Sequence, residues 1–207
     1  MSKGLEIALI VLGIIVVLGL VIAFIIRPWY MRWGATDAEL GLTLPGDDLK
    51  PAYEGIYTRA ITIQATPAAI YPWLAQMGQG KAGLYSIEFL ENLVGMDFKN
   101  ADTIHPEWQN IQIGDPVRMG PDGKAPPPYV VAQIYPNQAL ILGHKGDNGT
   151  WFDTWQFVLQ PIDAGSTRLI VRSRYDLWHN AFDYIVEPIS FMMARSMMYG
   201  IKQRAEQ

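Results

Sequence analysis

The sequence WFDTWQFVLQPIDAGSTRLIVRSRYD, residues 151–176, predicts a β-hairpin around which the rest of the fold can be placed. In its first half Trp155, Phe157 and Leu159 alternate with mostly polar residues, and its second half alternates in the same way. Such alternation indicates strands with one apolar and one polar face. A short Asp-Ala-Gly connection between the halves suits a hairpin turn. We therefore expect an antiparallel pair whose apolar face meets a core and whose polar face meets solvent.

Other strand-like runs extend this hairpin into a sheet, at residues 56–64, 116–119, 129–135 and 139–143. Helices are expected to begin near Thr66, near Tyr85 and near Pro188, where Glu187 supplies a negative charge suited to a helix N-terminus. The short connections indicate antiparallel pairing. The order of strand, two helices, several strands and one long helix predicts an α+β fold, in which the last helix covers the concave side of a curled sheet.

The N-terminal segment is apolar over residues 7–26, IALIVLGIIVVLGLVIAFII. A helix of about 20 residues spans about 30 Å, the thickness of the bilayer's hydrocarbon core. Arginine and aromatic residues follow this segment, as at a membrane interface, and we predict interfacial roles for Arg27, Trp29, Tyr30, Arg32 and Trp33. A secretory signal peptide is the rival interpretation, but it has a shorter apolar core and a small-residue cleavage site.

Three segments follow from this reading: an anchor with its interfacial belt at 1–33, a linker rich in Gly, Asp and Pro at 34–55, and a water-facing domain at 56–207. The expected location is the cell membrane, crossed once. Arg27 and Arg32 follow the apolar segment, whereas Lys3 precedes it, and this difference favours a cytoplasmic domain under the positive-inside rule.

Composition excludes several classes of function. The net charge is −4 and there is no long basic block, so nucleic acid is not expected as a partner. The chain has no cysteine, which rules out disulfides and thiolate metal sites. The three histidines, His105, His144 and His179, lack metal-ligand spacing, and the glycines around Gly78 lack phosphate-loop spacing. We expect no cofactor and no metal.

Several stretches resemble a known family. The longest is TRAITIQATPAAIYPWLAQMGQGKAGLYSIEFLEN at 58–92, and it is joined by WGAT at 33–36, LPGD at 44–47, NADTIHPEWQNIQIGD at 100–115, STRLIVRSR at 166–174 and GIKQRAE at 200–206. Together with the element order, they resemble the START-like (SRPBCC) superfamily with its helix-grip fold, and most closely bacterial proteins of the polyketide cyclase/dehydrase type. The resemblance implies a hydrophobic tunnel between the sheet and the last helix. Relatives bind lipids, polyketides or other apolar molecules, some as enzymes and some as binders, so the fold alone does not give the function.

A set of mostly apolar residues on the predicted inner faces is expected to line this tunnel: Trp73, Met77, Tyr85, Phe89, Trp155, Phe157, Leu159, Leu169, Val171, Ser173, Ile189, Met193 and Met197. Methionines suit adaptable apolar binding, and Ser173 is a polar group that could orient a ligand. Ordinary core packing is the alternative for each residue taken singly. His105, with Asp102 or Glu107 nearby, is a candidate acid or base, and a surface-loop histidine is the plainer reading.

Three functions remain open. The first is a membrane-tethered domain that binds an apolar small molecule or lipid without catalysis. The second is an accessory subunit of a membrane complex, with the anchor packed against partner helices; Gly19 and Ala23 form one small-residue pair suited to this. The third is a cyclase- or hydrolase-type enzyme acting on a hydrophobic substrate, which would need a convergent acid–base pair in the pocket.

Overall fold

The predicted hairpin is the centre of a six-stranded antiparallel sheet. In the computed structural model, which describes residues 3–177 and 181–207, the strand order is β1-β6-β5-β4-β3-β2. The strands are β1 (Gly55–Ile63), β2 (Pro116–Val117), β3 (Tyr129–Tyr135), β4 (Ala139–Lys145), β5 (Trp151–Pro161) and β6 (Thr167–Tyr175). Strands β5 and β6 pair in the expected register, with Trp155 opposite Ser173 and Leu159 opposite Leu169.

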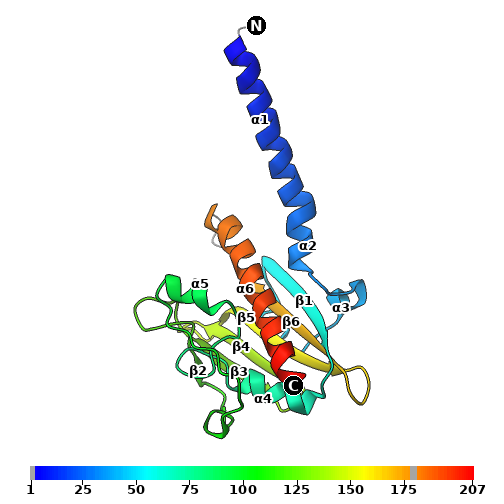
Figure 1. Ribbon diagram of the computed structural model, residues 1–207, viewed down its shortest axis with the longest axis vertical. Helices are drawn as coiled ribbons and strands as arrows, with labels where there is room; N and C mark the ends of the chain where they lie inside the picture. The colour runs from blue at the N-terminus through cyan, green and yellow to red at the C-terminus, as the bar shows by residue number, and fades with distance from the viewer. Residues whose placement is uncertain (1–2, 178–180) are drawn as a thin grey trace.

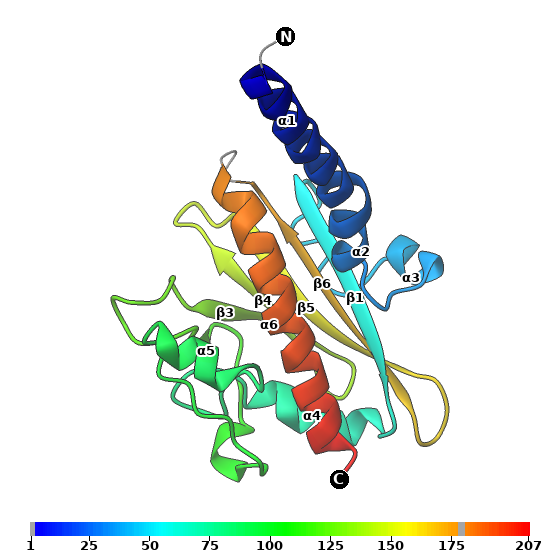
Figure 2. The same ribbon diagram turned by 45° about the horizontal axis from the view of Figure 1, so that its top comes forward.

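Helix α6 (Ala181–Ala205) runs across the curved sheet (Figures 1 and 2). The helices α4 (Pro67–Ala75) and α5 (Glu88–Leu93) lie on the same side as α6. A curved antiparallel sheet that holds one long C-terminal helix is the helix-grip arrangement, so the expected α+β fold class is confirmed.

The expected start of the last helix near Pro188 was wrong, because α6 begins at Ala181 and Pro188 lies inside it. A proline inside a helix removes one hydrogen bond, and here packing of the long helix overrides that local signal. Glu187 is therefore not a helix-terminal charge. Farther along α6, Gly200 lies so close to the segment between α4 and α5 that an added Cβ would be 2.1 Å from the carbonyl oxygen of Tyr85. A side chain at position 200 would push this end of α6 away from the domain.

The inner face of the sheet carries the main apolar core. This cluster joins the strands to α4 and to the second half of α6, where Met197, Met198 and Ile201 are buried. Here α6 lies against the sheet with tightly packed side chains between them. Side chains therefore fill the space between the sheet and the C-terminal half of α6.

The outer face of the sheet is buried, and the expectation that it meets solvent was wrong. Residues 34–50, which include the short helix α3 (Asp37–Gly41), lie over this face and pack on a second apolar cluster. Asp47 accepts hydrogen bonds from Arg172 at 2.9 Å and from Gln156 at 3.1 Å, both of which are buried. The polar residues of the alternating pattern are matched to a covering segment rather than to water.

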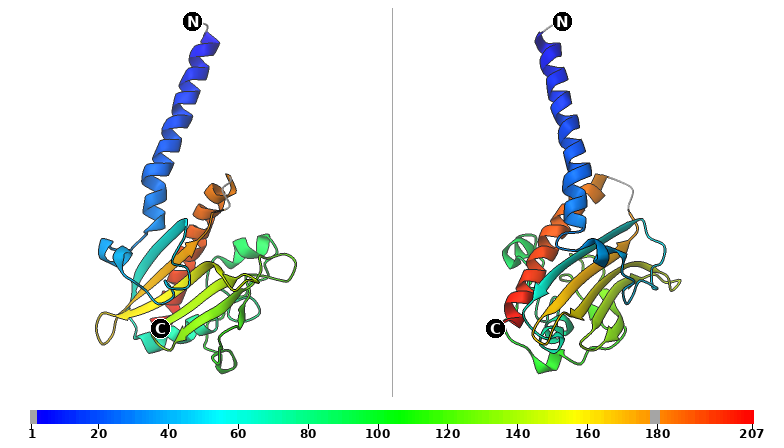
Figure 3. Two further views of the ribbon diagram at one scale, coloured as in Figure 1. Left: turned by 180° about the vertical axis from the view of Figure 1, so that it is seen from behind. Right: turned by 90° about the vertical axis from the view of Figure 1, so that its right-hand side faces the viewer.

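The N-terminal apolar segment forms one continuous helix: α1 (Lys3–Val21), a π-helical turn η1 (Ile22–Ile26) and α2 (Arg27–Met31). Figure 3 shows it projecting from the domain. Within the described residues, Lys3–Met31 is the one helix long and apolar enough to cross a bilayer. Its apolar side chains are exposed along α1.

The root of this helix is docked on α6. Arg27, one of the residues predicted at the membrane interface, makes two hydrogen bonds of 2.7 and 2.8 Å with Glu187. Tyr30 is buried with its ring 5.7 Å from that of Phe191, and Trp33 is 6.1 Å from the same ring. Trp29 keeps an exposed surface, and the exposed Arg32 pairs with Asp37. The helix therefore leaves the domain from a fixed base.

Candidate ligand-binding site

Two adjoining cavities lie between the first half of α6 and the inner face of the sheet. The cavity at the base of the N-terminal helix, here called the root cavity, has a volume of about 380 Å³ and is lined by residues including Met31, Arg59 and Glu187. The second, here called the methionine cavity, has a volume of about 310 Å³ and is lined by Met96, Met119, Met193 and Met197 among others. Tyr57, Tyr129, Val186 and Ser190 line both. A ligand could therefore extend from one cavity into the other.

The floor of the cavities is one row of the sheet. Tyr57 on β1 is opposite Ser173 on β6, which is opposite Trp155 on β5. Because side chains of directly opposed residues share a face, all three point toward α6. Tyr129 on β3 lies beside this row, with its ring centroid 5.4 Å from that of Trp155.

The structure separates the predicted lining residues into three groups. Those that line a cavity are Trp155, Ser173, Ile189, Met193 and Met197. Those in the packed core that line neither cavity are Trp73, Met77, Tyr85, Phe157, Leu159, Leu169 and Val171. Phe89 was misplaced: its side chain is 74% exposed on the surface of α5. The alternating pattern predicts which strand residues face α6. It does not predict along which part of the sheet a cavity separates them from the helix.

Several cavity residues were missed from the sequence. These are polar or charged residues: Tyr57, Arg59, Tyr129, Asp153 and Tyr175 on the strands, Glu187 on α6 and Glu91 on α5. One signal was present in β1, where Arg59 shares the apolar face with Ile61 and Ile63. A buried arginine needs a partner, so an arginine on an apolar face indicates a candidate functional residue.

At the root cavity, Glu187 is held by four donor atoms. Besides the two from Arg27, it accepts hydrogen bonds from Tyr30 Oη at 3.1 Å and Tyr175 Oη at 3.1 Å. Burial acts to raise the pKa of Glu187, but the hydrogen bonds and charge of Arg27 outweigh it, so the pKa lies below its usual value. Glu187 is therefore a carboxylate, neutralised by Arg27.

On the other side of the root cavity, Asp153 pairs with His144. His144 Nδ1 is 2.8 Å from Asp153 Oδ2, and His144 Nε2 is 2.9 Å from the carbonyl oxygen of Pro127. Both ring nitrogens face acceptors, which suits the doubly protonated form. Burial acts to lower the pKa of His144, yet the hydrogen bond and charge of Asp153 raise it above its usual value. Burial and the charge of Asp153 raise the pKa of Tyr129, so this phenol stays neutral.

Three buried polar atoms at the cavities have no hydrogen-bond partner within the described residues: Arg59 Nη1, Trp155 Nε1 and Glu91 Oε2. Arg59 lines the root cavity, and the other two line the methionine cavity. Burial raises the pKa of Glu91, although its other oxygen accepts a hydrogen bond of 2.5 Å from Ser86. Since buried polar groups are nearly always satisfied in proteins, orphan atoms facing cavities suit a bound molecule that carries polar groups.

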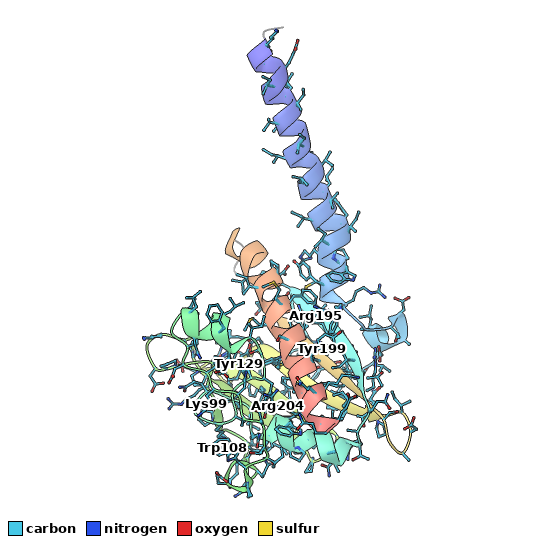
Figure 4. All side chains as sticks on the ribbon, in the orientation of Figure 1. Lys99, Trp108, Tyr129, Arg195, Tyr199 and Arg204 are labelled. Carbon is cyan, nitrogen blue, oxygen red and sulfur yellow. The ribbon has the colours of Figure 1, made fainter. Side chains whose placement is uncertain are left out.

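The candidate acid or base of the sequence lies elsewhere. His105 stacks on Trp108 with ring centroids 4.1 Å apart and pairs with Glu107 at 3.2 Å. It lines neither cavity, and Figure 4 shows the labelled Trp108 in the loop at the far end of the domain from α1. His179 lies outside the described residues. Within the described residues, no three His, Asp or Glu side chains are grouped to hold a metal ion.

No protein-family model matches this sequence, and no curated protein matches it. Among solved structures, the chain is similar to the Aha1 dimer from Colwellia psychrerythraea, with 16% identity, 74% of this chain and 97% of that chain covered, and a TM-score of 0.41. It is also similar to a norcoclaurine synthase point mutant from Thalictrum flavum, with 15% identity, 74% and 96% coverage and a TM-score of 0.41. A conserved protein of unknown function from Enterococcus faecalis has 14% identity, 73% and 71% coverage and a TM-score of 0.42.

Proposed function

We propose that this chain is a membrane-tethered helix-grip domain that binds an apolar small molecule or a lipid without catalysis. One observation carries the proposal: two adjoining cavities lie beneath α6 at the base of a helix long enough to span a bilayer. The same proposal divides the chain into three parts: an anchor at 1–33, a linker at 34–55 whose first part covers the outer face of the sheet, and a ligand-binding domain at 56–207.

The lining of the cavities supports an apolar guest. The four methionines of the methionine cavity are flexible and polarizable, so they can adapt to irregular apolar shapes. Each cavity lies at the lower end of the range of about 300–1,000 Å³ typical of small-molecule sites. A small or single-chain molecule fits this size better than a lipid with two long chains.

The position of the cavities supports a ligand drawn from the bilayer. Met31 ends the N-terminal helix and lines the root cavity, so anchor and cavity adjoin. A tether raises the local concentration of the domain near any molecule that partitions into lipid. Helix α5, near the end of the domain from which α1 projects (Figure 1), exposes Phe89, Leu93 and Val94 by 74%, 71% and 64%. Such apolar side chains suit contact with a membrane surface.

An accessory subunit of a membrane complex is the second candidate, favoured by the exposed apolar sides of α1 and α5, which partner helices could cover. The cyclase or hydrolase alternative receives less support because His105 lines neither cavity. A single membrane crossing with a cytoplasmic domain remains our proposal for location.

The test is mass spectrometry of small molecules extracted from the full-length chain after purification in mild detergent. We expect an apolar molecule in near-stoichiometric amount. The variant Ser190→Phe should reduce that amount, because Ser190 lines both cavities, whereas Met192→Phe on the exposed side of α6 should not. An empty protein that purifies with a fixed set of membrane subunits would instead favour the accessory role.

A further inference from the structure

The charges that line the root cavity do not balance. Three carboxylates line it, and each has its own cation: Glu187 has Arg27 at 2.7 Å, Asp153 has His144 at 2.8 Å and Asp176 has Lys50 at 2.8 Å. Arg59 also lines the cavity, and within the described residues it has no carboxylate partner. One positive charge is therefore left over at the cavity wall.

The surroundings of Arg59 leave part of its guanidinium unused. The side chain is 1% exposed, and its Nε donates one hydrogen bond of 3.0 Å to the carbonyl oxygen of Tyr30. Its guanidinium lies 4.0 Å from the ring centroid of Tyr57 and 5.1 Å from that of Phe191. These cation–π contacts favour the charge, but they satisfy no N–H group, and Nη1 has no hydrogen-bond partner among the residues that the structure describes. Leaving a buried charged donor unpaired costs free energy that a bound anion would recover.

We propose that Arg59 binds the anionic oxygen of an amphipathic ligand, a carboxylate or a phosphate, whose apolar body reaches from the root cavity into the methionine cavity. This inference rests on the proposed function and adds the chemical class of the ligand. Guanidinium is suited to both head groups because its planar donors match two oxygens at once. Ser173 and Ser190 line the same cavity and offer hydroxyl groups beside the head group.

The size and form of the cavities limit the rest of the ligand. The methionine cavity is lined mainly by apolar groups, so it suits a chain or a small ring system. Trp155 Nε1 and Glu91 Oε2 lie along its wall, and in the described part of the chain neither atom has a hydrogen-bond partner. A fatty-acid-like or small polycyclic acid meets all these conditions.

Three probes isolate the role of charge: dodecanoic acid, its methyl ester, and dodecyl phosphate. Their binding would be measured on the full-length chain in nanodiscs of neutral phosphatidylcholine, by displacement of the uncharged dye Nile red. Three proteins are compared: wild type, Arg59→Gln and Arg195→Gln. Arg195 is an exposed arginine of α6 that lines neither cavity. Its guanidinium lies 5.2 Å from the ring centroid of Tyr199, and Figure 4 labels both residues on α6.

We expect Arg59→Gln to weaken binding of the anionic probes about 10- to 100-fold, since hydrogen bonds to charged groups contribute about 1.5–3 kcal/mol. Arg59→Gln should leave binding of the methyl ester unchanged. Arg195→Gln should leave binding of the anionic probes and of the ester unchanged. The anionic probe that loses more binding, dodecanoic acid or dodecyl phosphate, shows whether the site prefers a carboxylate or a phosphate.

If the methyl ester binds wild type and Arg59→Gln leaves the anionic probes unaffected, the role of Arg59 is refuted while the proposed function stands. If no probe binds wild type, both are refuted. Should Arg59→Gln lose the methyl ester as well, the variant has lost the cavity, and two other comparisons decide. Wild type must then prefer the acid to its ester, and Arg59→Lys, which keeps the charge, must retain that preference; the absence of either result overturns the inference.

Discussion

The two faces of the sheet each bury an arginine, and they treat it differently. Arg172 on the outer face and Arg59 on the inner face are both 1% exposed and stand on the neighbouring strands β6 and β1. The Arg172 side chain makes five hydrogen bonds, one of them to the carboxylate of Asp47. Within the described ranges 3–177 and 181–207, Arg59 makes one, to a backbone carbonyl oxygen.

The difference lies in what surrounds each guanidinium. Arg172 has all its donors paired, which helps to fix a single packing arrangement, whereas Arg59 faces a cavity with a free donor. Gln156 Oε1 and Arg174 Nε on the outer face also have no partner within the described residues, but neither lines one of the two cavities. The outer face is thus a polar core sealed by residues 34–50. The inner face is sealed near Gly200 and left open near Glu187, where the cavities lie.

Loss of Asp47 should have the largest effect on stability. In Asp47→Ala, Arg172 and Arg174 lose their carboxylate, which lies 2.9 and 3.0 Å from them, and the Leu44 N–H loses its acceptor. Breaking a buried ion pair on one side costs about 3–5 kcal/mol. Urea unfolding of the full chain in mild detergent should show a loss of that order.

The adjacent Asp48→Ala is the matched control, because Asp48 is exposed. We expect its effect to stay within about 0.5 kcal/mol. Equal effects at the two positions would show that the outer face is not the sealed core described above.

The alternating pattern of residues 151–176 was sufficient to predict β5, β6 and their two faces. It was not sufficient to predict what covers each face, because a period of two is the same whether Arg172 meets water or a buried Asp47. The covering segment reads as a linker, rich in glycine, and only its long-range contacts reveal its role. Gly34 shows why a glycine is needed there: it has φ +71°, and an added Cβ would be 2.2 Å from the carbonyl oxygen of Ala60.

The lining of the cavities was predicted only in part, for a related reason. Apolar residues such as Phe157 and Leu169 share a face with Trp155, yet only Trp155 meets a cavity. Helix α6 begins at Ala181 and makes its close contact with the rest of the domain at Gly200. Neither position follows from local periodicity, and Pro188 pointed to a shorter helix.

The next largest effect concerns the base of the N-terminal helix. Glu187→Gln keeps the size of the side chain but removes the charge that holds Arg27. Because 36% of the Arg27 side chain is exposed, water compensates part of the loss, and we expect a cost of about 1–2 kcal/mol. Hydrogen–deuterium exchange at residues 27–33 should become roughly 5- to 30-fold faster.

Glu107→Gln is a suitable control, since that glutamate is exposed and distant from the helix. The depressed pKa of Glu187 adds a second check: its stabilising effect is present above about pH 4.5 and should be lost as the pH falls through its folded value. Unchanged exchange in Glu187→Gln would mean that aromatic packing on Phe191 alone holds the helix.

Arg59→Met should have a smaller effect on stability than either change above. It removes one hydrogen bond and two cation–π contacts, but it also removes the cost of an unpaired buried charge. We expect the free energy of unfolding, measured in urea without added ligand, to change by no more than about 1 kcal/mol. Arg172→Met is the comparison on the outer face, where the loss should be several times larger because Asp47 is left unpaired. A large loss in Arg59→Met would assign Arg59 to the structure of the domain alone.

The smallest effect is a pH dependence at the cavity wall. The pKa of His144 is raised in the folded protein, so its pairing with Asp153 stabilises the fold fully below the ordinary value of 6.5 and less as the pH rises through the folded value. The pair is about one-fifth exposed, and such a pair contributes about 0.5 kcal/mol or less. Urea unfolding of wild type and His144→Asn between pH 5.5 and 8.5 should show a difference that shrinks with rising pH. A difference that grows instead would mean that neutral His144 is the form held beside Asp153, and the root cavity would then carry one more unpaired negative charge opposite Arg59.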